Sequence, residues 1–255
     1  MRFKKIFFIF LFFSSFILNN SLLQAEETDE QFSNSNSVNK SKTEAKFYYL
    51  DGIYNYAKRF YQTSAENFEE LTKNYPYSKY TRNSLILEAY TSYINKDYEK
   101  IEGIFAIYQR LFLHDRYDDY MMFIRGMTYY RQVRNEQRSS DFIENSLDIF
   151  TQLVQKYPDS KFSKDVEVKI LYLKKLQQFS ELSIGEFYYK TDNYISAMRR
   201  YTGILQKYKD EIVPEIEERT LCRIVETSKS LEIESFTNYY SALLKEKYPD
   251  TICLS

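Results

Sequence analysis

The chain has 255 residues, with 35 Lys and Arg against 36 Asp and Glu, and 18% of its residues are aromatic. A nucleic-acid-binding surface needs a basic surplus or a clustered basic face, and this sequence has neither. Five glycines, four prolines and no tryptophan leave little material for tight hairpins or glycine-rich phosphate loops. We therefore expect the 26 tyrosines and 20 phenylalanines to lie mostly between helices.

The first 25 residues have the pattern of a secretory signal peptide. Arg2, Lys4 and Lys5 precede an apolar run from Ile6 to Leu18, and Ala25 offers a small residue for cleavage. This run is shorter than the roughly 20 residues that a membrane span needs. We expect cleavage after Ala25, which changes the formal net charge from -1 to -4 and places the mature chain outside the inner membrane. An uncleaved N-terminal anchor is the alternative.

Residues 26–43 follow, rich in Ser, Asn and acidic residues and without hydrophobic periodicity. This composition predicts a flexible polar tether. The segment has no heptad pattern, which argues against an N-terminal coiled coil.

Three tetrads of an aromatic residue, proline, a spacer and a hydroxyl residue divide the rest of the chain. They are Tyr75-Pro76-Tyr77-Ser78, Tyr157-Pro158-Asp159-Ser160 and Tyr248-Pro249-Asp250-Thr251. Proline has no amide proton and disfavours helix in the residue before it, so each tetrad should end a helix. The hydroxyl residue can then cap the next helix.

Small and large residues between these tetrads follow the 34-residue tetratricopeptide register. Gly52 and Phe68 have the same spacing as Gly185 and Tyr201, and small residues let paired helices approach closely. The sequence therefore predicts an all-α fold, a right-handed superhelix of about five tetratricopeptide-like hairpins. Their expected ranges within residues 44–255 are 44–76, 79–113, 116–158, 161–209 and 213–249.

Some hairpins depart from the regular register. Residues 161–190 are expected to form one long helix, and residues 131–140 an inserted loop. The last hairpin should be a capping repeat with a polar outer face. The residues expected on that face are Glu215, Glu217, Glu218 and Arg219.

The sequence contains no catalytic, metal or cofactor motif. His114 is the single histidine, and no HExxH, GxSxG, Walker loop or CxxC pattern occurs. We therefore expect no catalytic residue, no cofactor and no enzymatic activity. The two cysteines, Cys222 and Cys253, fit an oxidising compartment without establishing a disulfide. Cys222 lies in a helical pattern and is expected to be a small buried apolar residue.

Several local strings, taken in order from about Phe47 to Tyr248, resemble the BamD family of outer-membrane assembly lipoproteins. They are Tyr75–Tyr80, Tyr120–Met127, Leu171–Lys174, Gly185–Tyr189 and Asn193-Tyr194. The resemblance implies a periplasmic scaffold at the inner face of the outer membrane. Such a scaffold binds the POTRA domains of BamA and other assembly-complex subunits, and it helps deliver unfolded outer-membrane proteins for insertion.

The resemblance also implies two binding sites. Tyr75, Tyr80, Tyr120 and Arg125 would bind a substrate segment that ends in an aromatic residue and a free carboxylate. Inter-repeat packing is the alternative role for Tyr75 and Tyr120, and Arg125 could instead pair with a nearby acid such as Asp118 or Asp119.

The second implied site faces BamA. Arg199 and Arg200 match a family position and would face acidic residues of the POTRA domains. An ordinary solvated basic face is the alternative, and Glu186 could neutralise one of these two arginines.

The sequence departs from the family in one respect. The family carries a lipid on a cysteine directly after the signal peptide, but Glu26 stands there in this chain. Membrane association is therefore expected to come through partners. Another periplasmic tetratricopeptide adaptor, such as a Tol-Pal coordinator or a secretin pilotin, is the alternative function.

Overall fold

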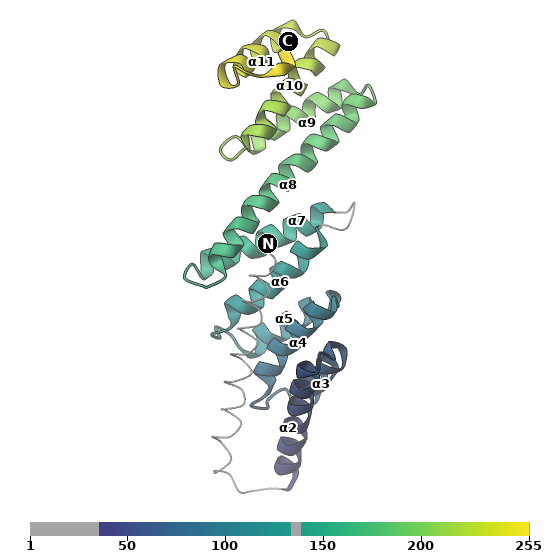
Figure 1. Ribbon diagram of the computed structural model, residues 1–255, viewed down its shortest axis with the longest axis vertical. Coiled ribbons are helices and arrows are strands. Elements are labelled where there is room, and N and C mark those ends of the chain that lie inside the picture. The colour runs from purple at the N-terminus through teal and green to yellow at the C-terminus, as the bar shows by residue number, and fades with distance from the viewer. Residues whose placement is uncertain (1–35, 134–138, 255) are drawn as a thin grey trace. The chain divides into compact units, whose positions relative to one another are not determined.

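The computed structural model describes residues 36–133 and 139–254, and across these ranges the fold is all-α (Figure 1). It has ten α-helices, α2 to α11, one short 3-10 turn, η1, and no strand within the described residues. The predicted all-α fold of helical hairpins is confirmed. The expected signal peptide, the first part of the expected tether and residues 134–138 of the expected insertion lie outside the described residues.

The chain divides into two compact units after Thr128. The first contains α2 (Asn36–Ala57), α3 (Tyr61–Asn74), α4 (Thr81–Asn95), α5 (Glu99–Leu111) and most of α6 (Asp118–Gln132). Helix α3 packs against both α2 and α4, and α4 packs against α5. Consecutive helices are therefore the packing partners in this unit.

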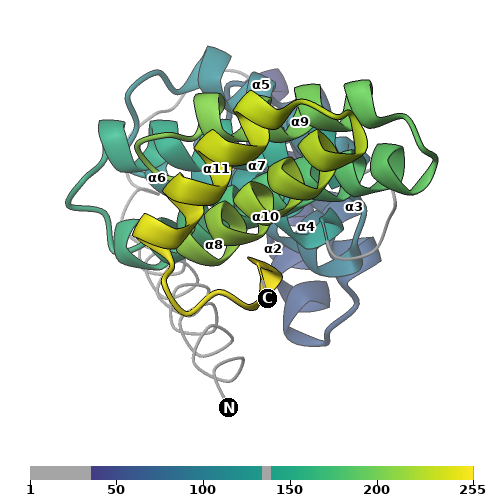
Figure 2. The ribbon, with the colours of Figure 1, turned by 90° about the horizontal axis from the view of Figure 1, so that it is seen from above.

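The second unit begins with the end of α6 and contains the remaining helices. These are α7 (Ser139–Lys156), α8 (Ser163–Lys190), α9 (Tyr194–Lys207), α10 (Pro214–Ser230), α11 (Glu234–Lys247) and η1 (Ile252–Leu254). Helix α8 packs against α7 and α9, and α10 packs against α8, α9 and α11 (Figures 1 and 2). The predicted single long helix is confirmed by α8, which has 28 residues.

Helix α2 begins at Asn36, whereas the sequence predicts a tether up to residue 43. Residues 36–43 contain neither proline nor glycine, so nothing in them ends a helix. Ala45 and Tyr49, one helical turn apart, are buried and fix the helix immediately after this segment. Extending an existing helix costs far less than nucleating one, which explains the earlier start.

The expected loop at residues 131–140 is also shorter than predicted. Helix α6 continues to Gln132, and α7 begins at Ser139. The side chain of Val133 is buried and contributes to the core at the end of α6.

The first tyrosine-proline tetrad forms a hydrogen-bonded turn between α3 and α4. The Ser78 amide donates to the Tyr75 carbonyl at 3.0 Å, and Thr81 Oγ1 donates to the same carbonyl at 2.7 Å. The Ser78 hydroxyl accepts from the amide of Tyr80, the residue before α4. Residues 157–163 repeat all three bonds before α8. The sequence predicts that the serine hydroxyl caps amides inside the next helix, and this is wrong: the hydroxyl orders the turn before the helix.

The third tetrad forms the same turn but precedes no α-helix. The Thr251 amide donates to the Tyr248 carbonyl at 3.1 Å, and only the 3-10 turn η1 follows. The expected capping role of Thr251 is therefore wrong, because no α-helix follows it within the described residues.

Two glycines allow the close helix approach that the register predicts. A Cβ on Gly52 would lie 2.6 Å from Phe68 Cε1, and one on Gly185 would lie 2.4 Å from Tyr201 Cε1. Both rings are fully buried. In both the α2–α3 pair and the α8–α9 pair, an aromatic ring therefore occupies the space that a side chain at the glycine position would need.

The polar face expected on the last hairpin is used differently in the structure. Glu215 accepts from Lys175 of α8 at 2.7 Å, and Arg219 Nη2 lies 2.6 Å from Glu186 of α8. These charges therefore link α10 to α8 instead of forming only a solvated outer surface. The pattern of charges alone cannot distinguish a solvated face from one that pairs with a neighbouring helix.

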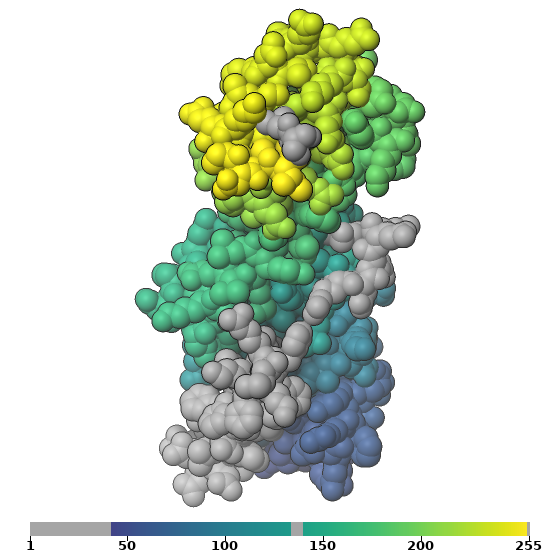
Figure 3. Space-filling view, turned by 45° about the horizontal axis from the view of Figure 1, so that its top comes forward, coloured from purple at the N-terminus to yellow at the C-terminus, as the bar shows by residue number. Residues whose placement is uncertain are grey.

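Cys222 and Cys253 form a disulfide with a Cα–Cα distance of 6.0 Å. The expectation of a simple buried apolar cysteine at position 222 is therefore wrong. The turn at residues 248–251 brings the C-terminal segment back to α10, 31 residues away in sequence. Figure 3 shows the C-terminal residues packed together on the surface of this unit.

No helix within the two described ranges is both long enough and apolar enough to cross a bilayer.

Candidate functional site

Two tyrosines of the predicted substrate site lie in the core of the first unit. Tyr80 is 7% exposed, and its ring stacks on Tyr49 with 4.9 Å between centroids. Tyr120 is 2% exposed, and burial raises its pKa well above the ordinary value. Their faces are unavailable to a peptide, so the structure supports packing for both. Aromatic residues at helical spacing have the same pattern whether they fill a core or line a groove.

Tyr75 and Arg125 are half-buried and both hold carboxylates of the chain itself. The Tyr75 hydroxyl donates to Glu44 at 2.6 Å, and this bond raises the pKa of Tyr75 to about 12. Arg125 Nε donates to both Glu102 oxygens, at 2.8 and 3.0 Å. The structure thus pairs Arg125 with an acid on α5, not with either acid suggested by the sequence.

A weak signal for the Arg125–Glu102 pair can be found in the residue spacing on α5. Glu102 lies on α5, and the guanidinium of Arg125 also lies over the Phe105 ring at 4.7 Å. Glu102 and Phe105 are three residues apart on α5, so their side chains share one face of this helix. Only the position of α5 beside α6 selects Glu102 over the acids that lie nearer to Arg125 in the sequence.

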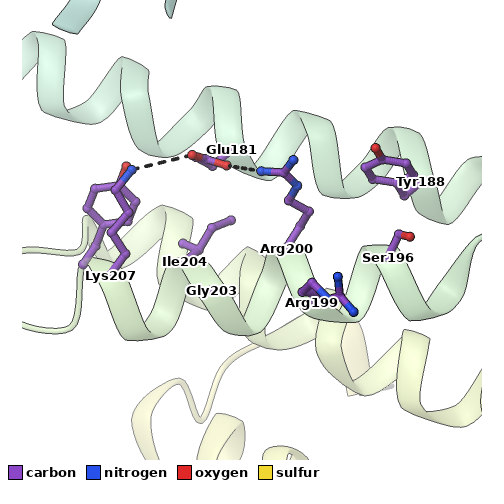
Figure 4. Close-up of a pocket in the computed structure, with 9 residues that line it drawn as sticks. Glu181, Tyr188, Ser196, Arg199, Arg200, Gly203, Ile204 and Lys207 are labelled. Atoms are coloured by element: carbon purple, nitrogen blue, oxygen red, sulfur yellow. Dashed lines mark hydrogen bonds and ion pairs between the residues drawn. The ribbon is translucent and has the colours of Figure 1, made fainter.

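The second predicted site coincides with a pocket on the α8–α9 hairpin. The pocket has a volume of about 330 Å³ and is drawn in Figure 4. Its polar lining consists of Glu181 and Tyr188 from α8, and Ser196, Arg199, Arg200 and Lys207 from α9. Ile204 and Tyr208, both buried, add apolar surface. The two predicted arginines therefore lie in one pocket with a third cation, Lys207, which no motif in the sequence singles out.

Helix periodicity explains why these residues share a face. Asn193 caps α9 by accepting from the Ser196 amide at 3.3 Å. Positions 196, 199, 200, 203 and 207 then recur at helical spacing, which places them along one stripe. A Cβ on Gly203 would meet no atom within 4 Å, so this glycine leaves open space in the pocket.

Glu181 is the single carboxylate of the pocket lining. Its Oε2 lies 3.3 Å from Arg200 Nη1, and its Oε1 lies 3.6 Å from Lys207 Nζ. Figure 4 shows Glu181 reaching from α8 to a point between these two cations. The side chain of Tyr208, and after it the charge of Glu181, raise the pKa of Lys207, so the ammonium remains charged at neutral pH.

Arg199 is exposed and forms no ion pair with any residue that the structure describes. Three cations therefore face one carboxylate, and the pocket carries a net positive charge. Such a site attracts acidic groups.

Glu186 does not neutralise either of the two pocket arginines. It lies 2.6 Å from Arg219 and 3.5 Å from Arg223, and its side chain is 14% exposed. The expectation that it could pair with Arg199 or Arg200 is wrong. One and a half helical turns separate Glu181 from Glu186, so they point in different directions: Glu181 toward α9, Glu186 toward α10.

The described residues contain no group of three His, Cys, Asp or Glu side chains that could hold a metal ion. His114 adopts a left-handed backbone conformation with φ of 59°, in the turn after α5.

The model of one protein family, YfiO, described as outer membrane lipoprotein, matches residues 27–243. This range covers most of the chain. The chain belongs to the YfiO/BamD family. The matched range of this BamD-family chain includes the whole α8–α9 pocket and ends before Cys253.

Curated relatives of this BamD-family chain are between 22% and 27% identical to it over the aligned residues. It is 25% identical over 205 residues to the outer membrane protein assembly factor BamD of Rickettsia prowazekii, covering 80% of each chain. It is 22% identical over 187 residues to the protein of the same name from Caulobacter vibrioides, covering 73% of this chain and 60% of that one. Both relatives are named as assembly factors.

Among solved structures, the chain aligns with pilF of Pseudomonas aeruginosa at 13% identity. The alignment covers 84% of this chain and 96% of that one, with a TM-score of 0.30. So low a score supports no conclusion.

Proposed function

We propose that this chain is a non-catalytic periplasmic scaffold of the outer-membrane β-barrel assembly machinery. The observation that carries the proposal is the family match over residues 27–243, together with relatives named outer membrane protein assembly factor BamD. Paired helices offer extended surfaces for polypeptide partners, which suits a scaffold.

The α8–α9 pocket is the proposed docking site for BamA. Arg199 and Arg200 are exposed there, and Lys207 adds a third positive charge. Acidic residues of the POTRA domains would be attracted by this charge, which favours encounter and fixes orientation. A solvated basic face would be spread over a convex surface, whereas these cations line one cavity.

Delivery of unfolded outer-membrane proteins is the second part of the proposal. Of the four residues expected to bind a substrate segment, Tyr75 and Arg125 remain candidates because they retain exposed atoms. A carboxylate at the end of a substrate would compete with Glu102 for Arg125, since Glu102 is 42% exposed and can move aside.

The proposed location is the periplasm at the inner face of the outer membrane, with membrane association through partners. The Cys222–Cys253 disulfide supports an oxidising compartment. The YfiO family is described as outer membrane lipoprotein, which supports the same site of action.

Crosslinking capture of the tagged chain from intact cell envelopes tests this function. We expect BamA among the crosslinked partners, and the Arg199→Glu/Arg200→Glu variant should lose most of it because the change reverses the charge that faces the POTRA domains. A matched variant, Lys164→Glu/Lys190→Glu, makes the same change in net charge at the two ends of α8 and should retain BamA. Circular dichroism of each variant checks that the helices persist.

Two results would contradict the proposal. Recovery of a secretin or of TolA without BamA would instead indicate another periplasmic adaptor. Equal BamA recovery by both double variants, with helicity intact, would remove the α8–α9 pocket from the docking surface.

A further inference from the structure

We propose that Glu181 is an intramolecular competitor, which occupies Arg200 and Lys207 until an acidic side chain of the partner replaces it. This inference rests on the proposed docking role of the α8–α9 pocket. It makes Glu181 the residue that sets how tightly the pocket holds an acidic polypeptide segment.

The distances show that Glu181 holds its cations loosely. Strong charge-assisted hydrogen bonds between nitrogen and oxygen measure about 2.7–2.9 Å. Glu181 lies 3.3 Å from Arg200 and 3.6 Å from Lys207. Its position between them is a compromise in which neither pair reaches optimal geometry (Figure 4).

Glu186, one and a half turns further along the same helix, provides the contrast. It lies 2.6 Å from Arg219, and only 14% of its side chain is exposed, against 28% for Glu181. A carboxylate that serves only to join helices is expected to resemble Glu186. Glu181 instead faces an open pocket.

The cations themselves are accessible to a partner. The side chain of Arg200 is 46% exposed, and that of Lys207 is 55% exposed. Both can leave Glu181 by rotating their long side chains, and Gly203 between them leaves space for an incoming group. A partner with two neighbouring carboxylates could engage Arg199 directly and take over Arg200 from Glu181.

Because an incoming carboxylate must replace Glu181, we expect Glu181 to lower the affinity of the pocket for acidic ligands. An incoming acidic group gains the cations but loses the existing Glu181 contacts and is repelled by the Glu181 charge. Glu181 therefore weakens acidic ligands and has little effect on neutral ones. Removing its charge should tighten acidic binding and steepen the salt dependence.

Fluorescence anisotropy with purified mature chain tests this role. The probes are a labelled peptide with four consecutive glutamates, the same peptide with glutamines, and the purified POTRA domains of BamA. We expect Glu181→Gln to bind the glutamate peptide and the POTRA domains about 3- to 10-fold tighter at low salt. The glutamine peptide should show no change. Glu246→Gln, an exposed site on α11 with the same charge change, is the matched control and should leave all affinities unaltered.

The double variant Glu181→Gln/Arg200→Gln separates competition from a structural effect. If Glu181 acts through Arg200, most of the gain disappears when Arg200 is absent. If Glu181→Gln loses helicity, Glu181→Asp serves instead, because the shorter side chain retracts from both cations while keeping its charge. It should give a smaller gain in affinity for the glutamate peptide.

The outcomes distinguish this inference from the docking proposal. Unchanged or weaker acidic binding by a folded Glu181→Gln or Glu181→Asp variant overturns the competitor role. If Arg199→Glu/Arg200→Glu still abolishes POTRA binding in that case, the docking site stands without it. If neither set of variants alters binding, both proposals are wrong.

Discussion

Glu88 is a buried carboxyl group in the first unit. It is 5% exposed on α4 and accepts a hydrogen bond from Thr72 at 3.3 Å. Burial, and after it the charge of Glu69, raise the pKa of Glu88 to about 8. The folded chain therefore keeps a proton on Glu88 that the unfolded chain releases near pH 4.5.

The raised pKa of Glu88 predicts that the folded chain becomes less stable as the pH rises. Because the folded pKa is raised, the stability contribution is complete below the unfolded pKa and is lost as the pH rises toward 8. At about 1.4 kcal/mol per unit, the loss is roughly 3–5 kcal/mol. Glu88→Gln keeps the shape and removes the titration, so it should be more stable than the original chain at pH 8.5 and similar at pH 4.5. Urea unfolding at both pH values measures this.

The exposed Glu70→Gln variant is the control and should retain the pH dependence of the original chain. An equal loss of stability with pH in Glu88→Gln would show that Glu88 is not its source.

At the scale of helices, the α2–α3 pair and the α8–α9 pair are packed in the same way. In each pair a glycine faces a fully buried aromatic ring of the next helix. The register of the sequence fixes which residues meet, and the absence of a side chain fixes how closely the helices approach. The α8–α9 pocket depends on this approach, because its residues come from both helices.

Gly185→Ala tests this packing. The new Cβ would lie 2.4 Å from Tyr201 Cε1, and the Tyr201 ring is fully buried, so the ring or the helix must shift. We expect a loss of about 1–3 kcal/mol in the free energy of unfolding. Alanine is intrinsically the better helix former by about 1 kcal/mol, so the steric term must exceed this gain.

Gly203→Ala provides the matched control on the partner helix. A Cβ there meets nothing within 4 Å, so only the propensity gain remains and the variant should be equally or more stable. Thermal unfolding of both variants compares them. A Gly185→Ala variant as stable as Gly203→Ala would contradict the packing argument.

At the scale of the whole molecule, the redox state of the surroundings determines whether the Cys222–Cys253 disulfide forms. The chain has two cysteines, and both belong to the Cys222–Cys253 disulfide. This bridge joins η1, which follows α11, to α10 of the last hairpin. An oxidising compartment is therefore part of the proposed working environment.

Reduction should destabilise the chain. A disulfide that closes a loop of this length contributes about 3–4 kcal/mol in the chain-entropy model. We expect the purified chain to show no free thiol before reduction and a lower melting temperature after it. The Cys222→Ser/Cys253→Ser variant should melt at the lower temperature with or without reductant. A melting temperature insensitive to reduction would mean that the bridge does not stabilise the fold.

The sequence by itself determined the helical class, the long α8 and the close approach at Gly52 and Gly185, because these follow from periodicity and side-chain size along the chain. The resemblance to the BamD family, carried by short strings of the sequence, also pointed to Arg199 and Arg200. Tertiary structure alone decided that Tyr80 and Tyr120 are buried, that Arg125 pairs with Glu102, and that Glu181 and Lys207 complete the pocket. Each of these depends on which helix packs alongside, and partner choice across helices is set by three-dimensional contact, which local sequence pattern does not encode.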